Sequence, residues 1–411
     1  MHTREPIVYD LAGFGRLFLT VRPFSLTISV NHQSIFSFDR DGRLIGAFLN
    51  GVHYKRGLQN DVLKKAVHTD RSTTLEVLEP AERDALLSAI GHQTDAIKQA
   101  LEPHLEQATR AWFDAILAWD VTSLEAERTR FNAIYRPVSI LPPDHYLAVV
   151  LQATEGCTWN QCTFCDFYRD RRFHMKSVQE FRQHIAAVKA FFGRSLGLRK
   201  SIFLADANAL IIPQRRLVEL LGSVHESFSI GAGGGGNQGD EHTRFEGIYS
   251  FLDIFGAERK TLSDYAELAA LGLKRIYIGL ETGDTTLFEW LNKPGSPQAC
   301  IDAVQTIKAT GISVGIIVLA GVGGNWRFQE HIDQTLQTLH AMSLDQSDIV
   351  YLSPIVTIAD SAYAQQMHRL GIATPAPAEI QAQLQQFKTR LYRQHQQRPR
   401  VTLYDIRAWI Y

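Results

Sequence analysis

From residue 145 onward, short apolar runs alternate with stretches in which apolar residues recur at helical spacing. The runs are Tyr146–Leu151, Ser201–Leu204, Ile248–Asp253, Arg275–Leu280, Ser313–Leu319 and Asp348–Leu352. The helical patterns between and after them cover 177–192, 214–224, 262–271, 297–309 and 330–342. Strands buried on both faces read as nearly continuous apolar runs. Six strand–helix units in a row therefore predict a parallel sheet, either wound open or curled into a partial barrel.

The first 140 residues have a different texture. Three strand-like pieces, Leu26–Val30, Ser34–Phe38 and Leu44–Phe48, predict a small antiparallel hairpin or meander. A long helical pattern follows over 80–134, and Pro142-Pro143 marks a boundary. We expect an N-terminal α+β domain at 1–140, a barrel at 145–360 and a C-terminal extension at 361–411. The extension has a helix near 377–395 and a strand at Val401–Tyr404.

Composition excludes several classes of protein. The 411 residues carry a formal net charge of −1, which argues against a sequence-independent nucleic-acid binder. No segment reaches the roughly 18 apolar residues that cross a bilayer. The first residues lack the apolar region of a signal peptide, so the default expectation is a soluble cytoplasmic protein.

Three of the four cysteines fall within nine residues, which indicates a metal site and not a disulfide framework. Cys157, Cys162 and Cys165 follow the first strand of the predicted sheet, in a loop that can turn three sulfurs toward one place. Thiolates suit iron–sulfur clusters or zinc. Three ligands would leave one iron of a four-iron cluster open to a substrate or cofactor.

Two alternatives remain open for these cysteines. A structural zinc site needs four ligands, and the fourth would be His174 or Cys300. The spacing C-x4-C-x2-C also occurs in plant-type [2Fe–2S] electron carriers, with Cys300 as the fourth ligand. Cys300 lies inside an amphipathic helical pattern, where a buried structural cysteine is the usual reading. Either alternative would make the chain a non-enzymatic electron-transfer or zinc-stabilised protein.

The cysteine segment 155–168 resembles the radical SAM superfamily, and the resemblance extends over about 145–355. The usual spacing there is C-x3-C-x2-C, and this chain has one extra residue in the first gap. Phe203–Leu210 resembles the second-strand segment that replaces the family's Gly-Gly-Glu motif, and Ile276–Gly283 is similar to a fourth-strand segment. The core looks most like that of MiaB, NifB, the elongator catalytic subunit and the oxygen-independent coproporphyrinogen oxidases.

The resemblance implies a partial (β/α)6 TIM-like barrel with a [4Fe–4S] cluster on Cys157, Cys162 and Cys165. It implies that S-adenosylmethionine binds the open iron, with Phe164 near its adenine. The implied activity is reductive cleavage of S-adenosylmethionine to a 5′-deoxyadenosyl radical, which abstracts hydrogen from a substrate that the sequence does not identify. A low-potential electron donor such as flavodoxin or ferredoxin is the implied partner.

Polar residues and glycines follow the strands where working residues of βα barrels lie. Asp206 or Asn208 is expected to accept hydrogen bonds from the ammonium group of S-adenosylmethionine, and Glu281 or Asp253 to hold ribose hydroxyls. The alternative for each acid is a helix cap. We further assign to cofactor binding the strand-end residues Thr282, Gly321 and Gly323, since glycine allows close approach of the backbone.

The glycine run Gly231–Gly236 formally matches a dinucleotide-binding motif. No helical pattern follows it, as that motif would require. We interpret it as a mobile loop over the predicted pocket.

Overall fold

A computed structural model describes the chain except residues 1–4, 69–72, 232–243 and 395–398. The described residues form two compact units. One contains the chain up to Ser139 together with Ala186–Lys200 and Arg407–Tyr411, and the other contains Ile140–Ile185 and Ser201–Ile406. We describe each unit by itself.

The larger unit is built on a parallel sheet of seven strands. They are β9 (Ala148–Gln152), β12 (Ser201–Ala205), β15 (Ile248–Phe251), β16 (Leu273–Glu281), β17 (Ser313–Ala320), β18 (Ile349–Pro354) and β19 (Arg400–Leu403). Their spatial order is β19-β18-β17-β16-β15-β12-β9, so neighbours in sequence are neighbours in space. This arrangement confirms the predicted partial TIM-like barrel, with β9 and β19 at its edges. The C-terminal strand β19 pairs with β18 and adds a seventh strand to the six expected.

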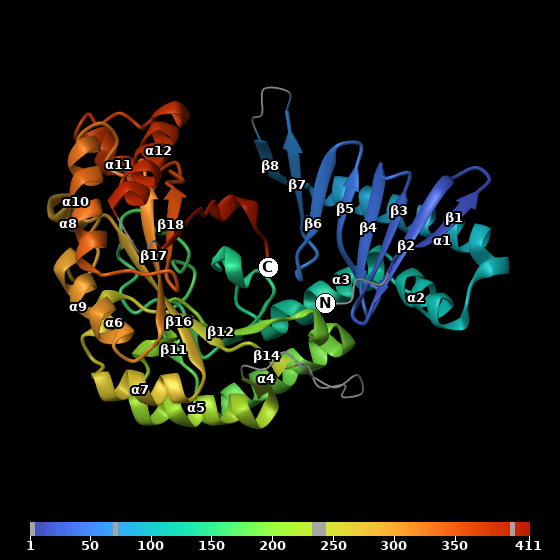
Figure 1. Ribbon diagram of the computed structural model, residues 1–411, viewed down its shortest axis with the longest axis horizontal. Helices are drawn as coiled ribbons and strands as arrows, with labels where there is room; N and C mark the ends of the chain where they lie inside the picture. The colour runs from blue at the N-terminus through green and yellow to red at the C-terminus, as the bar shows by residue number, and fades with distance from the viewer. Residues whose placement is uncertain (1–4, 69–72, 232–243, 395–398) are drawn as a thin grey trace. The chain divides into compact units, whose positions relative to one another are not determined.

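Helices follow most of these strands. They are α4 (Val178–Phe192), α5 (Gln214–Ser227), α6 (Ile254–Ala257), α7 (Leu262–Ala270), α8 (Thr285–Trp290), α9 (Pro297–Lys308), α10 (Phe328–Ala341), α11 (Ala362–Arg369) and α12 (Pro377–Gln394). Helices α7 and α9 lie against β16, and α9 and α12 lie against β17 (Figure 1). All residues of β9 and β12 are buried, which explains their apolar sequences.

The amino-terminal ends of the strands are tied together by one carboxylate. Asp144, just before β9, accepts hydrogen bonds from the hydroxyls of Tyr277 (2.6 Å) and Tyr351 (2.5 Å) and from Arg275 Nη1 (2.9 Å). Tyr277 lies on β16 and Tyr351 on β18, so a single side chain joins the start of the barrel to its later strands. This end of the barrel is therefore a packed structural base.

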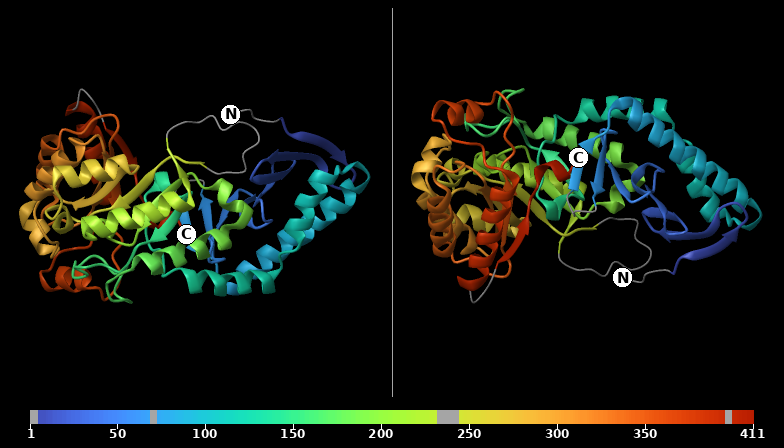
Figure 2. Two further views of the ribbon diagram at one scale, coloured as in Figure 1. Left: turned by 90° about the horizontal axis from the view of Figure 1, so that it is seen from below. Right: turned by 90° about the horizontal axis from the view of Figure 1, so that it is seen from above.

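The smaller unit contains an antiparallel meander of eight strands, in sequence order (Figure 2). They are β1 (Ile7–Leu11), β2 (Gly15–Arg22), β3 (Ser25–Val30), β4 (Ser34–Asp39), β5 (Leu44–Leu49), β6 (Val52–Arg56), β7 (Val62–Val67) and β8 (Thr73–Val77). The sequence predicted only β3, β4 and β5. The other strands carry charged or exposed residues, which weaken the alternation of apolar and polar positions.

The helical pattern over 80–134 forms three helices, α1 (Pro80–Leu101), α2 (Gln107–Leu117) and α3 (Val121–Ile134). Buried side chains from α1 and α2, among them Ile97 and Phe113, pack with Leu26, Ile28 and Phe36 of the sheet. The expected α+β character of the N-terminal region is thus confirmed. In the described part of the chain, we find no helix with both the length and the apolar character that a bilayer span needs.

Candidate active site

The carboxyl ends of the seven parallel strands lie along one edge of the sheet. A cysteine and several acidic residues lie at or just after these strand ends. Cys157 follows β9, Asp206 follows β12, Asp253 follows β15 and Glu281 ends β16. Working residues of βα barrels come from this edge. The residues singled out from the sequence are therefore brought to the same rim by the topology.

The three clustered cysteines are free thiols that are partly exposed. Burial, with a smaller contribution from the neighbouring thiols of the loop, raises the pKa of Cys162 to about 11 and that of Cys165 to about 12. A soft metal centre would relieve this cost, because thiolates bind metal in deprotonated form.

Within the described ranges, no three His, Cys, Asp or Glu side chains converge on one point as a single metal ion would require. A four-iron cluster makes a different demand, because each thiolate binds its own iron. Cys300 is fully buried in α9, near Lys293 and Glu281, which is the setting of a structural cysteine. Three thiols in one loop are the donor chemistry that an iron–sulfur cluster with one open iron requires.

Asp206 ties the cysteine loop to the sheet. Its carboxylate accepts hydrogen bonds from the backbone N–H of Gly156 (3.1 Å), from Gln152 Nε2 (3.3 Å) and from Arg171 Nη1 (3.3 Å). Burial nevertheless raises the pKa of Asp206 to about 6. Both carboxylate oxygens thus have protein partners, and the side chain anchors the residue directly before Cys157.

Asn208 and Asp253 lie side by side at the next position along the rim. The Asn208 side chain is fully buried, and its amide oxygen Oδ1 has no hydrogen-bond partner among the described residues. Asp253 accepts the backbone N–H of Gly256 and so caps α6, as the cap alternative expected. Burial raises the pKa of the Asp253 carboxyl. A buried acceptor without a donor is what an ammonium group or a ribose hydroxyl would satisfy.

Glu281 is paired with a residue that sequence reasoning missed. Lys293 Nζ lies 3.4 Å from Glu281 Oε1, and both side chains are 10% exposed. Burial alone would lower the pKa of Lys293, but the negative charge of Glu281 holds that pKa above its usual value. A buried ammonium group therefore stands beside the carboxylate at the end of β16. In the sequence, Lys293 sits in a polar Asn-Lys-Pro-Gly turn, which reads as ordinary surface.

Glycine makes room for this pair at Gly279. A Cβ there would come within 2.1 Å of Glu281 Oε1 and 3.3 Å of Lys293 Nζ. Glu281 itself has a left-handed backbone, with φ of 62°, which is rare for a residue with a side chain. The strand end is thus shaped around the buried carboxylate and its ammonium partner.

Thr282 is engaged with the outer layer of helices. Its hydroxyl donates to Nδ1 of buried His331 on α10 (2.7 Å), and His331 Nε2 donates to the carbonyl of Leu319 (2.9 Å). Burial lowers the pKa of His331 to about 4, so the ring is neutral at physiological pH. Thr282 therefore fastens strand β16 to α10, and His331 is a packing residue.

The glycines after β17 are covered by protein. A Cβ on Gly321 would come within 2.9 Å of Ile380 on α12, and one on Gly323 within 3.0 Å of Leu287 on α8. The N–H of Gly323 donates to the hydroxyl of Tyr363 (3.0 Å). Both positions have positive φ, so their glycines serve a turn and close packing.

Phe164 packs against an apolar cluster at the same rim, which includes Leu287, Leu291, Tyr363 and Met367. It is partly exposed. The cluster gives the cysteine loop an apolar neighbour that excludes water, a factor that tunes iron–sulfur potentials.

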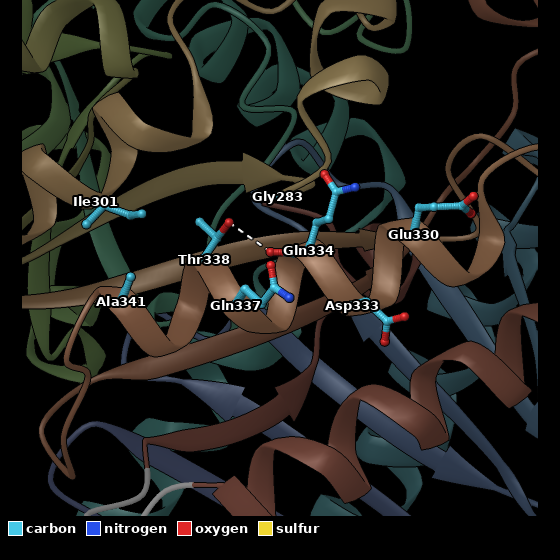
Figure 3. A pocket seen from close by; sticks show the side chains of 8 residues that line it. All are labelled: Gly283, Ile301, Glu330, Asp333, Gln334, Gln337, Thr338 and Ala341. Carbon is cyan, nitrogen blue, oxygen red and sulfur yellow. Dashed lines mark hydrogen bonds between the residues drawn. The ribbon is translucent and has the colours of Figure 1, made fainter.

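A surface hollow runs along α10, far along the chain from the cysteines (Figure 3). It is lined by Gly283, Ile301, Glu330, Asp333, Gln334, Gln337, Thr338 and Ala341. The glycine-rich run expected to form a mobile loop falls almost entirely within residues 232–243, outside the described part of the chain.

Comparison with solved structures returns radical SAM proteins of low identity. Coproporphyrinogen III oxidase HemN, a radical SAM enzyme from Escherichia coli, is 14% identical with a TM-score of 0.43, over 64% of this chain and 55% of HemN. SuiB from Streptococcus suis is 12% identical with a TM-score of 0.41, over 86% and 72%. The methyltransferase TsrM from Kitasatospora setae is 13% identical with a TM-score of 0.39, over 56% and 41%.

The chain thus spans about half of the length of HemN. Because these TM-scores lie below 0.5, we infer nothing about substrate from them. No curated protein matches the chain.

The family comparison is specific. The model of the radical SAM superfamily matches residues 151–339, which contain the three clustered cysteines and the carboxyl ends of β9, β12, β15, β16 and β17. Members of this superfamily are enzymes that use a [4Fe–4S] cluster and S-adenosylmethionine, and membership implies S-adenosylmethionine-dependent radical chemistry. The family match thus assigns residues 151–339 of the chain to the radical SAM superfamily.

Proposed function

We propose that this chain holds a [4Fe–4S] cluster on Cys157, Cys162 and Cys165 and uses it to cleave S-adenosylmethionine reductively. One observation carries the proposal. Three free thiols of one short loop follow β9 at the rim where Asn208 offers a buried, unpartnered acceptor and Lys293 a buried ammonium group. Three thiolates leave one iron of four without a protein ligand, and the polar groups for an amino-acid-like cofactor lie at the same edge.

The residues of the rim divide into binding and positioning roles. Asn208 Oδ1 is the acceptor we assign to the ammonium group of the cofactor. Asp253 and Glu281 keep carboxylate oxygens at the same rim for ribose hydroxyls or the ammonium group, and charge-assisted hydrogen bonds are the strong ones. Asp206 serves as a positioning residue, because its oxygens are occupied by Gly156, Gln152 and Arg171.

When bound, the cluster and S-adenosylmethionine supply an electron and a sulfonium whose cleavage gives methionine and a 5′-deoxyadenosyl radical. The protein supplies geometry and exclusion of solvent. Phe164 and the apolar cluster around Leu287 and Tyr363 shield the loop from water. The buried ammonium group of Lys293, paired with Glu281 at the end of β16, places a positive charge at the same rim.

We assign this chemistry to the predicted barrel at 145–360, with 1–140 as a flanking region and 361–411 as an extension that adds strand β19 to the barrel sheet. A low-potential donor such as flavodoxin or ferredoxin would supply the electron. The large antiparallel sheet of the N-terminal region is the candidate surface for substrate or partner recognition, because the residues of the rim are already committed to the cofactors.

Anaerobic reconstitution tests the proposal. We expect about four irons and four sulfides per chain, with methionine and 5′-deoxyadenosine released after dithionite is added. Cys162→Ala should abolish 5′-deoxyadenosine formation, whereas Cys300→Ala, which removes a buried thiol in α9, should retain the cluster and the activity. Bound zinc, two irons per chain, or turnover by the Cys162→Ala variant would each contradict the assignment.

A further inference from the structure

The loop that carries the cysteines is fastened to a second segment, Leu291–Lys293, which follows α8. The indole N–H of Trp159 donates to the carbonyl of Asn292 (2.7 Å), and Asn292 Nδ2 donates to the carbonyl of Gln161 (2.9 Å). The backbone N–H of Thr163 donates to the carbonyl of Leu291 (3.0 Å). Every second residue from 159 to 163 is therefore anchored to the same short segment.

These contacts frame the four-residue gap between Cys157 and Cys162. Within the gap, Asn160 has a left-handed backbone with φ of 50°, and its side chain donates to the carbonyl of Tyr168 (2.8 Å). Asn292 on the opposite segment is also left-handed, with φ of 52°. Two asparagines thus make tight turns that bring the segments together, a backbone shape that asparagine tolerates better than most residues.

The same segment ends in the buried ammonium group. Lys293 follows Asn292 directly, and its Nζ lies 3.4 Å from Glu281 Oε1 in a pair whose side chains are both 10% exposed. The residue after Cys162, Thr163, is bonded to Leu291 of the same segment, so a shift of the segment relative to the cysteine loop would also change the position of the ammonium group relative to Cys162.

Resting on the proposed function, we propose that Leu291–Lys293 is a positioning strap. It holds the gap between Cys157 and Cys162 in shape, and it sets the position of the Cys162 thiolate relative to the ammonium group of Lys293. Asn292 and Trp159 are its positioning residues. The strap governs how firmly the cluster is retained and how strongly the buried cation favours the reduced cluster.

Two variants remove single contacts. Asn292→Gly keeps a residue that accepts the left-handed backbone but removes the donor to Gln161, and Trp159→Phe keeps an aromatic ring but removes the donor to Asn292. The matched control is Asn50→Gly, because Asn50 is an exposed asparagine with φ of 50° in the turn between β5 and β6.

The first measurement is hydrogen–deuterium exchange of the full-length chain before reconstitution. Each strap variant should raise exchange across 159–163 by about five-fold, as loss of one hydrogen bond predicts, while the control stays at the parent rate. This measurement does not require a cluster. A parent chain without a four-iron centre would contradict the proposed function. The exchange rates would still test the strap, because they are measured on protein without a cluster.

The second measurement uses the reconstituted protein. Each strap variant should lose iron to a chelator about five-fold faster than the parent. The midpoint potential of its cluster should be lower, because the ammonium group of Lys293 is held less rigidly relative to the cluster and stabilises the reduced form less. A merely structural loss would leave the potential of the surviving cluster unchanged. Exchange and iron-release rates within two-fold of the parent in both variants, or an unchanged potential, would overturn the strap.

Discussion

The Glu281–Lys293 pair is buried at the rim, and Gly279 is the residue that leaves space for it. In Gly279→Ala, the new Cβ would stand 2.1 Å from Glu281 Oε1, far inside contact distance, and 3.2 Å from Glu281 Cδ. The carboxylate must rotate away, and Lys293 then loses its partner while it stays buried. Breaking a buried ion pair costs about 3–5 kcal/mol. We therefore expect Gly279→Ala to lower the free energy of unfolding by about 3 kcal/mol.

Urea unfolding of the full-length chain under reducing, anaerobic conditions measures this loss. Gly222→Ala is the matched control, because Gly222 lies inside α5 and a Cβ there meets nothing within 4 Å. The free energy of unfolding of that control should rise by up to about 1 kcal/mol, because alanine has a higher helix propensity than glycine.

A second background separates the ion pair from general crowding. In Glu281→Ala/Lys293→Met, both charged groups are gone, so adding Gly279→Ala should cost less than about 1 kcal/mol. The reasoning would be refuted if Gly279→Ala cost the same in both backgrounds. It would also be refuted if the free energy of unfolding of the single variant lay within about 0.5 kcal/mol of the parent value, because surface substitutions usually have effects of that size.

The remaining predictions concern stability and its pH dependence. The pKa of Asp206 is raised to about 6 from 3.8, so its contribution to stability is present below pH 3.8 and is lost as pH rises through 6. Between pH 4 and pH 8, the free energy of unfolding of Asp206→Asn should therefore rise by roughly 3 kcal/mol relative to that of the parent. If urea unfolding gave the same difference between variant and parent at both pH values, this prediction would be wrong. Asp144→Ala should lower the free energy of unfolding by about 3 kcal/mol, because the hydroxyls of Tyr277 and Tyr351 lose their acceptor. Since Asp144 lies at the opposite end of the strands from the cysteines, an altered iron content in that variant would count against the assignment of this end as a structural base.

Much of the barrel could be predicted from the sequence, because buried parallel strands leave short, apolar runs that local reading detects. The run Ser201–Leu204, for example, became β12 with one added residue. In the N-terminal sheet, only three of the eight strands were predicted, because the other strands lack a clear apolar pattern. Strand β7 carries Lys64 and Lys65, and β8 is mostly exposed, so neither shows the alternation that marks a half-buried strand.

At the rim, the sequence located positions but not side-chain directions. Thr282 follows β16 as expected, yet its hydroxyl is turned toward His331 because α10 packs against that side of the strand end. Gly321 and Gly323 follow β17 as expected, yet α12 and α8 cover them. Which way a strand-end side chain points depends on the helices packed around it, and that packing involves residues distant in sequence.

The sequence by itself determined that a parallel α/β core carries three clustered cysteines after its first strand, because hydrophobic period and ligand spacing are local properties of the chain. Only the tertiary structure decided that Lys293 is buried beside Glu281, and that Asp206 is occupied in anchoring the cysteine loop. Both outcomes follow from burial. A charged group removed from water must find a partner, and the fold determines which group is near enough to be that partner.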